Sequence, residues 1–133
     1  MPYNATIVAL GAVGVGSGSM KLALYADDGT GTKPSTAAPV AATATSIALG
    51  ISAVETTNFL PQPTSLTQGA TYWLAFKLNI VANIRAQANA SQVGLRVTSQ
   101  PFGDAFPANP AGGSPLTVNG NEFAVYMRVH DTN

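Results

Sequence analysis

Two groups of side chains in this sequence could bind a ligand, and the first is a pair of carboxylates in a turn. Asp27 and Asp28 stand directly before Gly29, at the end of an alternating apolar segment. Calcium takes about six to eight oxygen ligands, more than two side chains provide, and nothing in the sequence places Asp104 or Glu122 nearby. We therefore interpret the pair as a turn in which aspartate bonds the local backbone. Asp27 and Asp28 are the only calcium candidates, and we expect no bound metal or other cofactor.

The second group lies in a long segment that is rich in proline and glycine. Phe102, Asp104 and Phe106 alternate there with small residues. Aromatic rings beside a carboxylate are what a site for a sugar or for a protein surface uses. The same rings could instead plug one end of a β-sandwich. We take these three residues as candidates for contact with a glycan or a partner protein.

The remaining reactive side chains do not form a catalytic pattern. His130 is the only histidine, and the chain has no cysteine. A Ser–His–Asp triad would have to use His130, and no Gly-x-Ser-x-Gly segment is present to hold the serine. The six acidic residues are scattered over turns and strand ends, with no pair that suggests glycoside hydrolysis. We expect His130 to be an exposed strand residue and the protein not to be an enzyme.

The composition argues against several classes of partner. Six basic and six acidic residues give a formal net charge of zero, and charged residues make up 9% of the chain, against a usual ~25%. Nucleic acids and anionic membranes both attract a clustered basic face, so we expect neither as a partner. Residues 5–16 are apolar but short and broken by glycine, unlike a signal peptide or a membrane span. Because the chain starts at Met1, we expect a whole gene product that folds in the cytoplasm.

These candidates must be positioned by β-strands, because the apolar residues alternate with period two. In residues 20–26, Leu22 and Leu24 face one side while Lys21 and Ala23 face the other. The strongest alternation spans residues 71–78, whose even-numbered residues share one face and whose odd-numbered residues share the other. Trp73 belongs to the odd-numbered face, at the edge of the core, where we expect a partner for its indole N–H.

The same reasoning assigns the rest of the chain. The strands that the pattern predicts lie at residues 5–15, 20–26, 40–43, 46–54, 59–61, 71–78, 92–98 and 122–131. We expect the first to bend at Gly11, and the fifth to lie at a sheet edge because of Pro61 and Pro63. Residues 79–89 could hold a strand at 80–84 or a short helix around 85–90, and residues 99–121 are expected to form one long loop. About eight strands predict a single domain over residues 1–133, an all-β, jelly-roll-like antiparallel β-sandwich.

Several of these segments, in their order along the chain, resemble a jelly-roll domain of phage virions. The segments are KLALYADDGTG at 21–31, LTQGATYWLAFKLN at 66–79, VGLRVTS at 93–99 and FAVYMRV at 123–129. That family shows a strand ending in IYADNG and, after a loop, a segment of the form sLtaGtYWlaf. It occurs at the tips of tail fibres and in other virion surface proteins. The resemblance covers about residues 6–130, nearly the whole chain.

The sequence departs from the family pattern at two places. The family usually has another strand or two before the segment that matches residues 6–15, and only five residues precede it here. The loop after Thr30 has Lys33-Pro34-Ser35 where the family has a Pro-Gly pair. A missing first strand would leave an exposed sheet edge, and such edges are commonly covered by a neighbouring chain. We therefore expect an oligomer.

The resemblance implies a structural protein of a tailed-phage virion that is made in the host cytoplasm. A single bare domain with an uncharged surface rich in Ala, Thr and Ser favours a capsid decoration (cement) protein. Such a protein would form a homotrimer on the major capsid protein and stabilise the shell. The alternatives are a tail-fibre tip that presents residues 99–121 to a host glycan, and a carbohydrate-binding module.

Overall fold

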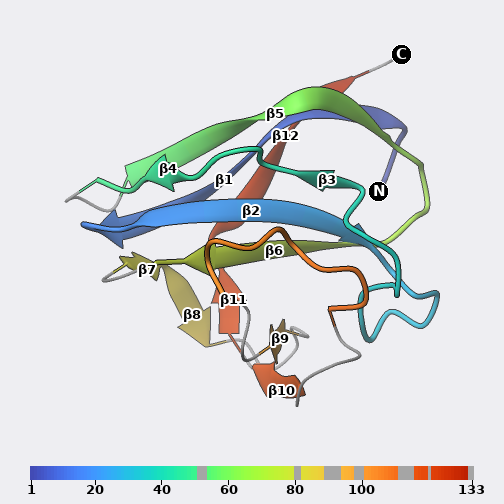
Figure 1. Ribbon diagram of the computed structural model, residues 1–133. Helices are drawn as coiled ribbons and strands as arrows, with labels where there is room; N and C mark the ends of the chain where they lie inside the picture. Colours follow the sequence, from blue (N-terminus) through green and yellow to red (C-terminus); the bar gives the residue numbers. More distant parts are fainter. Residues whose placement is uncertain are drawn as a thin grey trace.

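The computed structural model describes residues 1–50, 54–79, 82–88, 94–97, 101–110, 116–119 and 121–131. Over these residues the chain is all-β, and two antiparallel sheets pack face to face (Figure 1). The expectation of an antiparallel β-sandwich is confirmed, while the jelly-roll connectivity stays a prediction. The described part of the chain offers no membrane-spanning helix.

The first sheet, called sheet A, is built around β1 (Ala5–Gly16). The long strand β5 (Val54–Leu66) runs along one side of β1. The other side is shared by β12 (Val125–Asp131), which pairs with residues 5–12, and β7 (Ala82–Ile84), which pairs with residues 14–16. All three neighbours are antiparallel to β1, so β5 and β12 run in the same direction at opposite edges. The expected edge position of the segment with Pro61 and Pro63 is confirmed, because both prolines lie in β5.

The second sheet, called sheet B, repeats this plan around β2 (Ser19–Ala26). The strand β6 (Tyr72–Leu78) pairs with the whole of β2 on one side. On the other side lie two short strands, β3 (Ala41–Ala42) and β4 (Ile47–Ala48). The predicted strands 20–26 and 71–78 are confirmed. The strands predicted at 40–43 and 46–54 are found only as β3 and β4 in the described residues; residues 51–53 lie outside these, and Val54 begins β5.

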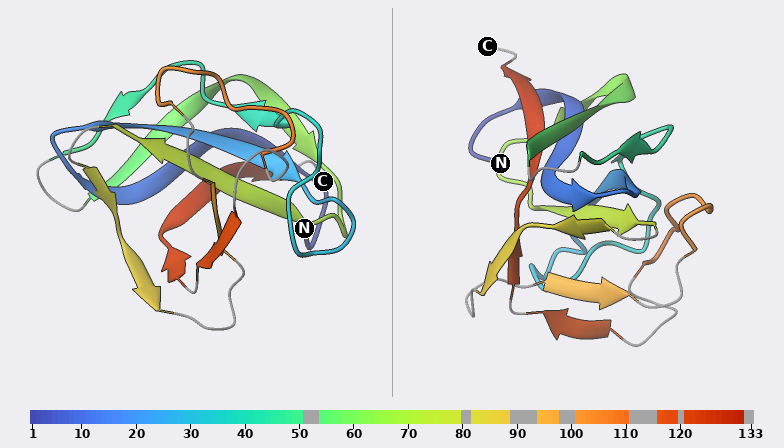
Figure 2. Two further views of the ribbon diagram at one scale, coloured as in Figure 1. Left: turned by 60° about the horizontal axis from the view of Figure 1, so that its bottom comes forward. Right: turned by 90° about the vertical axis from the view of Figure 1, so that its left-hand side faces the viewer.

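Two short ribbons extend from one side of the sandwich (Figure 2). One pairs β8 (Ala86–Ala88) with β11 (Asn121–Phe123), and the other pairs β9 (Gly94–Val97) with β10 (Leu116–Asn119). The strand β9 lies within the predicted strand 92–98. Of the two alternatives for residues 79–89, the strand at 80–84 is found as β7 in its described part, residues 82–84, whereas β8 takes the place of the helix suggested around 85–90. The expectation that residues 99–121 form one loop is wrong, because they include β10. Short ribbon strands carry too few apolar positions for a period to be read from the sequence.

The core lies between the facing sides of β1 and β2. Its fully buried side chains come from alternate positions of these strands: Ile7, Leu10, Ala12, Met20, Leu22 and Leu24. The even-numbered residues of β6, with Val125 and Met127 of β12, pack against this cluster. The faces assigned from the alternation in 20–26 and 71–78 are therefore confirmed. Burial of this apolar area is the main favourable term for the fold.

The irregularity of β1 falls at Val8 and not at Gly11, where the bend was expected. The pairing register shifts between Ile7 and Ala9 against both neighbouring strands. Against β12 the extra residue is Val8, which makes it a bulge residue, whereas against β5 the extra residues are 60–63 of β5, which lie opposite Val8. Gly11 lies in regular pairing, and the ring of Tyr126 crosses directly over it. A Cβ at Gly11 would overlap that ring and would come within 2.7 Å of the Thr56 carbonyl oxygen. This glycine is required by the close approach of a side chain from β12.

Candidate functional site

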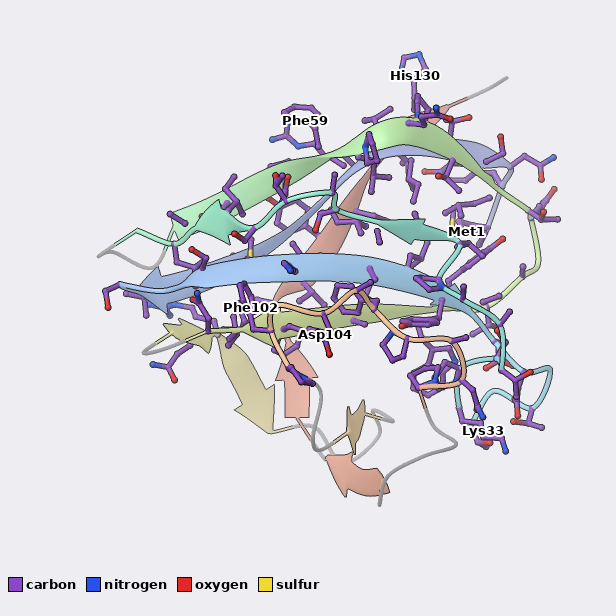
Figure 3. The ribbon with its side chains drawn as sticks, in the orientation of Figure 1. Met1, Lys33, Phe59, Phe102, Asp104 and His130 are labelled. Atoms are coloured by element: carbon purple, nitrogen blue, oxygen red, sulfur yellow. The ribbon has the colours of Figure 1, made fainter. Side chains whose placement is uncertain are left out.

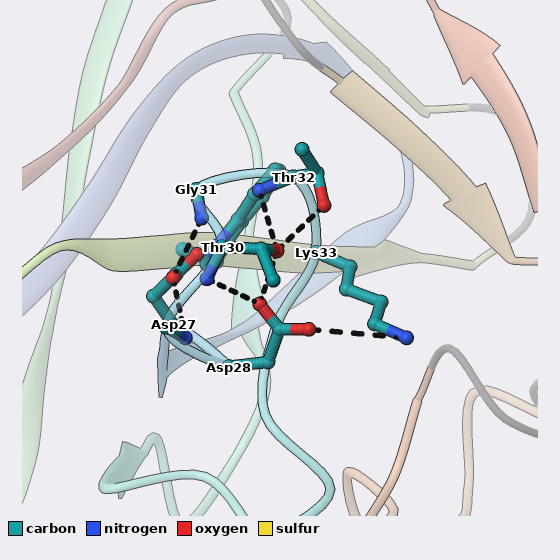
Figure 4. A network of polar contacts seen from close by, with 8 residues as sticks. Asp27, Asp28, Thr30, Gly31, Thr32 and Lys33 are labelled. Carbon is teal, nitrogen blue, oxygen red and sulfur yellow. Dashed lines mark hydrogen bonds and ion pairs between the residues drawn. The ribbon is translucent and has the colours of Figure 1, made fainter.

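The pair Asp27–Asp28 forms a turn whose carboxylates bond the turn itself (Figure 4). Oδ2 of Asp27 accepts the backbone N–H of Gly29 at 2.7 Å and that of Gly31 at 2.8 Å. Oδ1 of Asp28 accepts both the backbone N–H and the hydroxyl of Thr30. Gly29 and Gly31 have φ values of 97° and 74°, which side chains other than glycine rarely adopt. The interpretation of the two aspartates as turn residues is confirmed.

The second oxygen of Asp27 joins this turn to sheet B. The indole N–H of Trp73 donates to Oδ1 of Asp27 at 2.7 Å, so the expected partner of Trp73 is found. The bond from Trp73, followed by that from the Gly31 N–H, lowers the pKa of Asp27 below its ordinary value. The Thr30 hydroxyl is the largest cause of the lowered pKa of Asp28. Both carboxylates are therefore ionised at neutral pH and already hold hydrogen-bond donors.

These hydrogen bonds limit which carboxylate oxygens the turn could offer to a cation. Both oxygens of Asp27 accept N–H donors, and Oδ2 of Asp28 lies 3.8 Å from the ammonium of Lys33. Among the described residues, no three His, Cys, Asp or Glu side chains gather in a way that could hold a metal ion. The side chain of Glu122, one of the suggested helpers, lies outside the described residues. The carboxylates of the turn therefore bond groups of the protein itself at the end of β2.

A shallow depression of about 490 Å³ opens beside this turn. Its lining comes from the turn and from the segment that leads into β6, including Gly29, Thr30, Gly69 and Thr71. It also includes Asp27, whose carboxylate oxygens accept N–H donors of the protein. The polar groups that the lining offers are therefore hydroxyls and main-chain groups, because both carboxylate oxygens of Asp27 already accept hydrogen bonds from the protein.

The second predicted group lies in residues 101–110, called the strap, which cross the outer face of sheet B (Figure 3). Two lysines on neighbouring strands hold the strap. Lys21 of β2 is the cross-strand partner of Lys77 of β6. The ammonium of Lys21 donates to the carbonyl of Phe102 at 2.9 Å. The ammonium of Lys77 lies 3.2, 3.0 and 3.3 Å from the carbonyl oxygens of Pro101, Asp104 and Ala105.

The aromatic rings of the strap lie against the same two cations. Nζ of Lys21 is 4.9 Å from the centre of the Phe102 ring, and Nζ of Lys77 is 4.7 Å from that of Phe106. Both distances are within the range of cation–π attraction. Burial lowers the pKa of Lys77, and the neighbouring charge of Lys21 lowers it further. The strap thus solvates two adjacent like charges with carbonyl oxygens and ring faces.

A third side chain of sheet B binds the far end of the strap. The hydroxyl of Tyr25 donates to the carbonyl of Pro107 at 2.8 Å. Tyr25 is 1% exposed, and burial raises its pKa to about 12. Tyr25 and Trp73 are cross-strand neighbours on the face that carries the two lysines. The strap thus covers the outer face of sheet B, and side chains of the sheet hold it through its main-chain carbonyl groups.

The structure thus places the three predicted contact residues together on one surface segment. Phe102 and Phe106 are half-buried and lie over the face of sheet B, not at the end of the sandwich. The residue Asp104 is exposed between them, and its backbone carbonyl holds Lys77. Sequence reasoning missed Lys21, Tyr25 and Lys77 as the residues that fix this segment. The sequence did contain one signal for these residues. Alternation places all three on the outward face of their strands, where the polar ends of their side chains need hydrogen-bond partners.

The single histidine lies where the sequence placed it. His130 is exposed on β12, close to the described end of the chain (Figure 3). It points away from the sandwich, as does Phe59 of β5, which is 66% exposed. The interpretation of His130 as an exposed strand residue is confirmed.

Comparisons of this chain with protein-family models, with curated proteins and with solved structures give no match. The geometry of the site and the residues themselves therefore carry the functional argument.

Proposed function

We propose that this protein is a structural component of a tailed-phage virion, most specifically a capsid decoration protein. In this role a trimer binds the major capsid protein at the outside of the shell. Bound copies stabilise the shell by mass action, because they bind the assembled form and not the dissociated one. No catalytic step, cofactor, nucleic acid or membrane is part of the proposal.

The observation that carries the proposal is the combination of a neutral surface with two unpaired sheet edges. Within the described residues, β5 and β12 each pair on one side only. Exposed apolar side chains lie on both strands, Phe59 on β5 and Val129 on β12. Prolines and charges commonly blunt such edges, and on β5 the two prolines, Pro61 and Pro63, lie beyond Phe59, so the segment from Val54 to Phe59 contains no proline. A chain with 9% charged residues and two sheet edges that pair with no described strand favours extensive contact with other subunits. The resemblance of residues 6–130 to phage virion domains supports the same assignment.

The test is binding to shells of the phage that encodes the protein. Purified protein would be mixed with expanded shells and with unexpanded precursors, and each mixture sedimented. We expect saturable binding to the expanded shells, together with a higher temperature of shell disruption. Absence of binding to both forms would contradict the proposal.

A second candidate is recognition of a host glycan by the strap, as in a tail-fibre tip. The observation in its favour is the exposed Asp104 between two half-buried aromatic residues on a segment that bulges from the sheet. A glycan array tests it, with Phe102→Ala and Asp104→Asn as variants and Phe59→Ala as the matched control on the other sheet. Binding that is lost in the first two and kept in the control would favour this candidate. If no glycan binds the unmodified protein, the candidate fails.

A further inference from the structure

Two lysines of this chain lie side by side on the outer face of sheet B. Lys21 of β2 and Lys77 of β6 are direct cross-strand partners, whereas the third lysine, Lys33, belongs to the acidic turn. The Cβ atoms of directly opposed residues are about 5 Å apart, and like charges at such positions destabilise a sheet. The face therefore holds two positive charges that repel each other unless a group of opposite charge lies nearby.

The described carboxylates of the protein do not neutralise this pair. The ammonium of Lys33 has the carboxylate of Asp28 at 3.8 Å. Over the described residues, no carboxylate oxygen lies within 4.0 Å of the ammonium of Lys21 or of Lys77. Asp104 raises the pKa of Lys77, but burial and the charge of Lys21 have larger effects and lower it. The lysine pair thus keeps a net positive charge on this part of the surface.

The groups that the strap offers to the pair are neutral. The ammonium of Lys77 bonds three carbonyl oxygens, and both ammoniums lie against ring faces. Such dipoles solvate a cation but do not cancel its charge. The ammonium of Lys21 has three N–H donors and, among the described residues, bonds one oxygen, the carbonyl of Phe102. Lys21 can therefore donate to a further acceptor while the strap stays in place.

The surface of the strap beside the lysines combines apolar and polar groups. Phe102 and Phe106 are half-buried, so each leaves part of its ring exposed next to a cation. Between the rings lies Gly103, where an added Cβ would meet nothing within 4 Å. The exposed carboxylate of Asp104 stands at the same place (Figure 3). A ligand here meets apolar ring surface, a hydrogen-bond acceptor and two cations.

We propose that the strap and the lysine pair together bind an acidic sugar residue of a glycan. This inference rests on the second candidate of the proposed function and names its ligand class. The anionic group of the sugar accepts a hydrogen bond from Lys21, and the charge of Lys77 strengthens the attraction. The C–H face of the sugar packs on Phe102 and Phe106, and a hydroxyl donates to Asp104. Because a lysine acts as a point charge, a carboxylate or a sulfate can fill the anionic position.

An acidic peptide is a less suitable ligand for the same surface. It would satisfy the lysine pair, but its successive carboxylates would also lie close to Asp104, which carries the same charge. A sugar with one anionic group directs that group to the lysines and presents hydroxyls elsewhere on its ring. The exposed acceptor and the cations therefore favour a ligand that has a single charge and several hydroxyl groups.

A glycan array that carries neutral, carboxylated and sulfated glycans tests the ligand class. We expect every glycan that the unmodified protein binds to be acidic. A bound carboxylated glycan would then be compared, by titration calorimetry, with the same glycan after reduction of its carboxyl groups to alcohols. We expect the reduced glycan to bind at least about tenfold more weakly, because the attraction to two nearby cations is lost. Binding of the acidic form should weaken as salt is added.

Variants of Lys21 test the position of the anionic group. Lys21→Gln removes the charge but keeps a donor for the carbonyl of Phe102, and we expect about a tenfold loss of affinity for the acidic glycan. Lys21→Arg keeps the charge and should retain most of the affinity. Lys33→Gln is the matched control, because it removes the same charge on the acidic turn and should bind as the unmodified protein does. Limited proteolysis of residues 101–106 checks that the strap stays in place in each variant.

Each result supports or overturns the proposal. Binding of neutral glycans as strongly as acidic ones, unchanged affinity in Lys21→Gln, or equal competition by a polyglutamate peptide would overturn it. If neutral glycans bind and Phe102→Ala abolishes their binding, only the acidic class is wrong and glycan recognition by the strap stands. If no glycan binds, both are wrong. The shell-binding assay is independent of these results and decides the capsid role separately.

Discussion

The two sheets share one plan but differ in how their outer faces are covered. Each has a central strand with one neighbour along one side and two shorter strands that share the other side. Sheet B is covered by a segment of the protein's own chain, the strap, through Lys21, Lys77 and Tyr25. Over sheet A, within the described residues, the cover comes from side chains of its own strands, chiefly Tyr126 over Gly11. The chain thus covers the outer face of sheet B with a distant segment, whereas the described cover of sheet A comes from its own strands.

The largest effect should come from the close contact on sheet A. Gly11→Ala would force the Tyr126 ring away and would press against the Thr56 carbonyl, where backbone cannot yield easily. We expect a loss of about 1–3 kcal/mol in the free energy of unfolding, the usual range for overpacking. Urea denaturation followed by circular dichroism measures it. Gly103→Ala is the matched control on the strap, because a Cβ there meets nothing within 4 Å. Equal losses in the two variants would contradict this account.

The next effect concerns the cations under the strap. Lys77→Met keeps the length of the side chain but removes the donor to three carbonyl groups. Such bonds to a charged donor are worth about 1–2 kcal/mol once partial exposure is allowed for. We expect faster hydrogen exchange and proteolysis within residues 101–106, with the core unchanged. Lys33→Met is the control, since that ammonium is 3.8 Å from its carboxylate on an exposed turn. A strap that stays equally protected in both variants would show that the lysines do not hold it.

A smaller effect is expected from the hydroxyl of Tyr25, with a distinct dependence on pH. Tyr25→Phe removes one hydrogen bond to the strap, at a cost of about 1 kcal/mol. In the native protein the folded pKa is about 12, above the value of about 10 in an unfolded chain. The contribution of Tyr25 is therefore complete below pH 10 and is lost as the pH rises toward 12.

Comparing the native protein with Tyr25→Phe isolates the hydroxyl of Tyr25, because every other titrating group is common to both proteins. The stability difference between the native protein and Tyr25→Phe should shrink between about pH 10 and 12. Absorbance at about 295 nm should show one tyrosine fewer among those that ionise late. Tyr3→Phe, at an exposed position, is the control and should change the free energy of unfolding little. A constant stability difference up to pH 12 would show that Tyr25 ionises normally.

The smallest effect is expected where sheet B meets the acidic turn. The pKa of Asp27 is lowered, first by the bond from Trp73, so its contribution is present above about pH 4 and is lost as the pH falls below its folded value. The fluorescence of Trp73, the only tryptophan, should report this titration. Asp27→Asn should abolish the acid transition, whereas Asp28→Asn should keep it, because Asp28 does not bond the indole. An acid transition unchanged in Asp27→Asn would assign it to another group.

Much of the framework could be predicted from alternation alone. The strands around β1, β2, β6 and β12, and the faces of β2 and β6, follow from period-two patterns over seven or more residues. The role of Asp27 and Asp28 as turn residues could also be predicted from the sequence, because an aspartate that bonds nearby N–H groups needs no distant partner. By contrast, the alternation in residues 5–16 did not reveal the bulge at Val8, which depends on register with two other strands.

The candidate site divides in the same way. The sequence by itself determined that this chain is an all-β sandwich, that Lys21 and Lys77 lie on outward faces, and that Phe102, Asp104 and Phe106 form a local group. Only the tertiary structure decided that the two lysines are neighbours, that the strap crosses above them, and that Tyr126 requires a glycine on the strand paired with its own. Alternation is a property of neighbouring residues and is written in the local sequence. Contacts between residues 80 positions apart depend on which strands pair, and many sequences with the same alternation could pair differently.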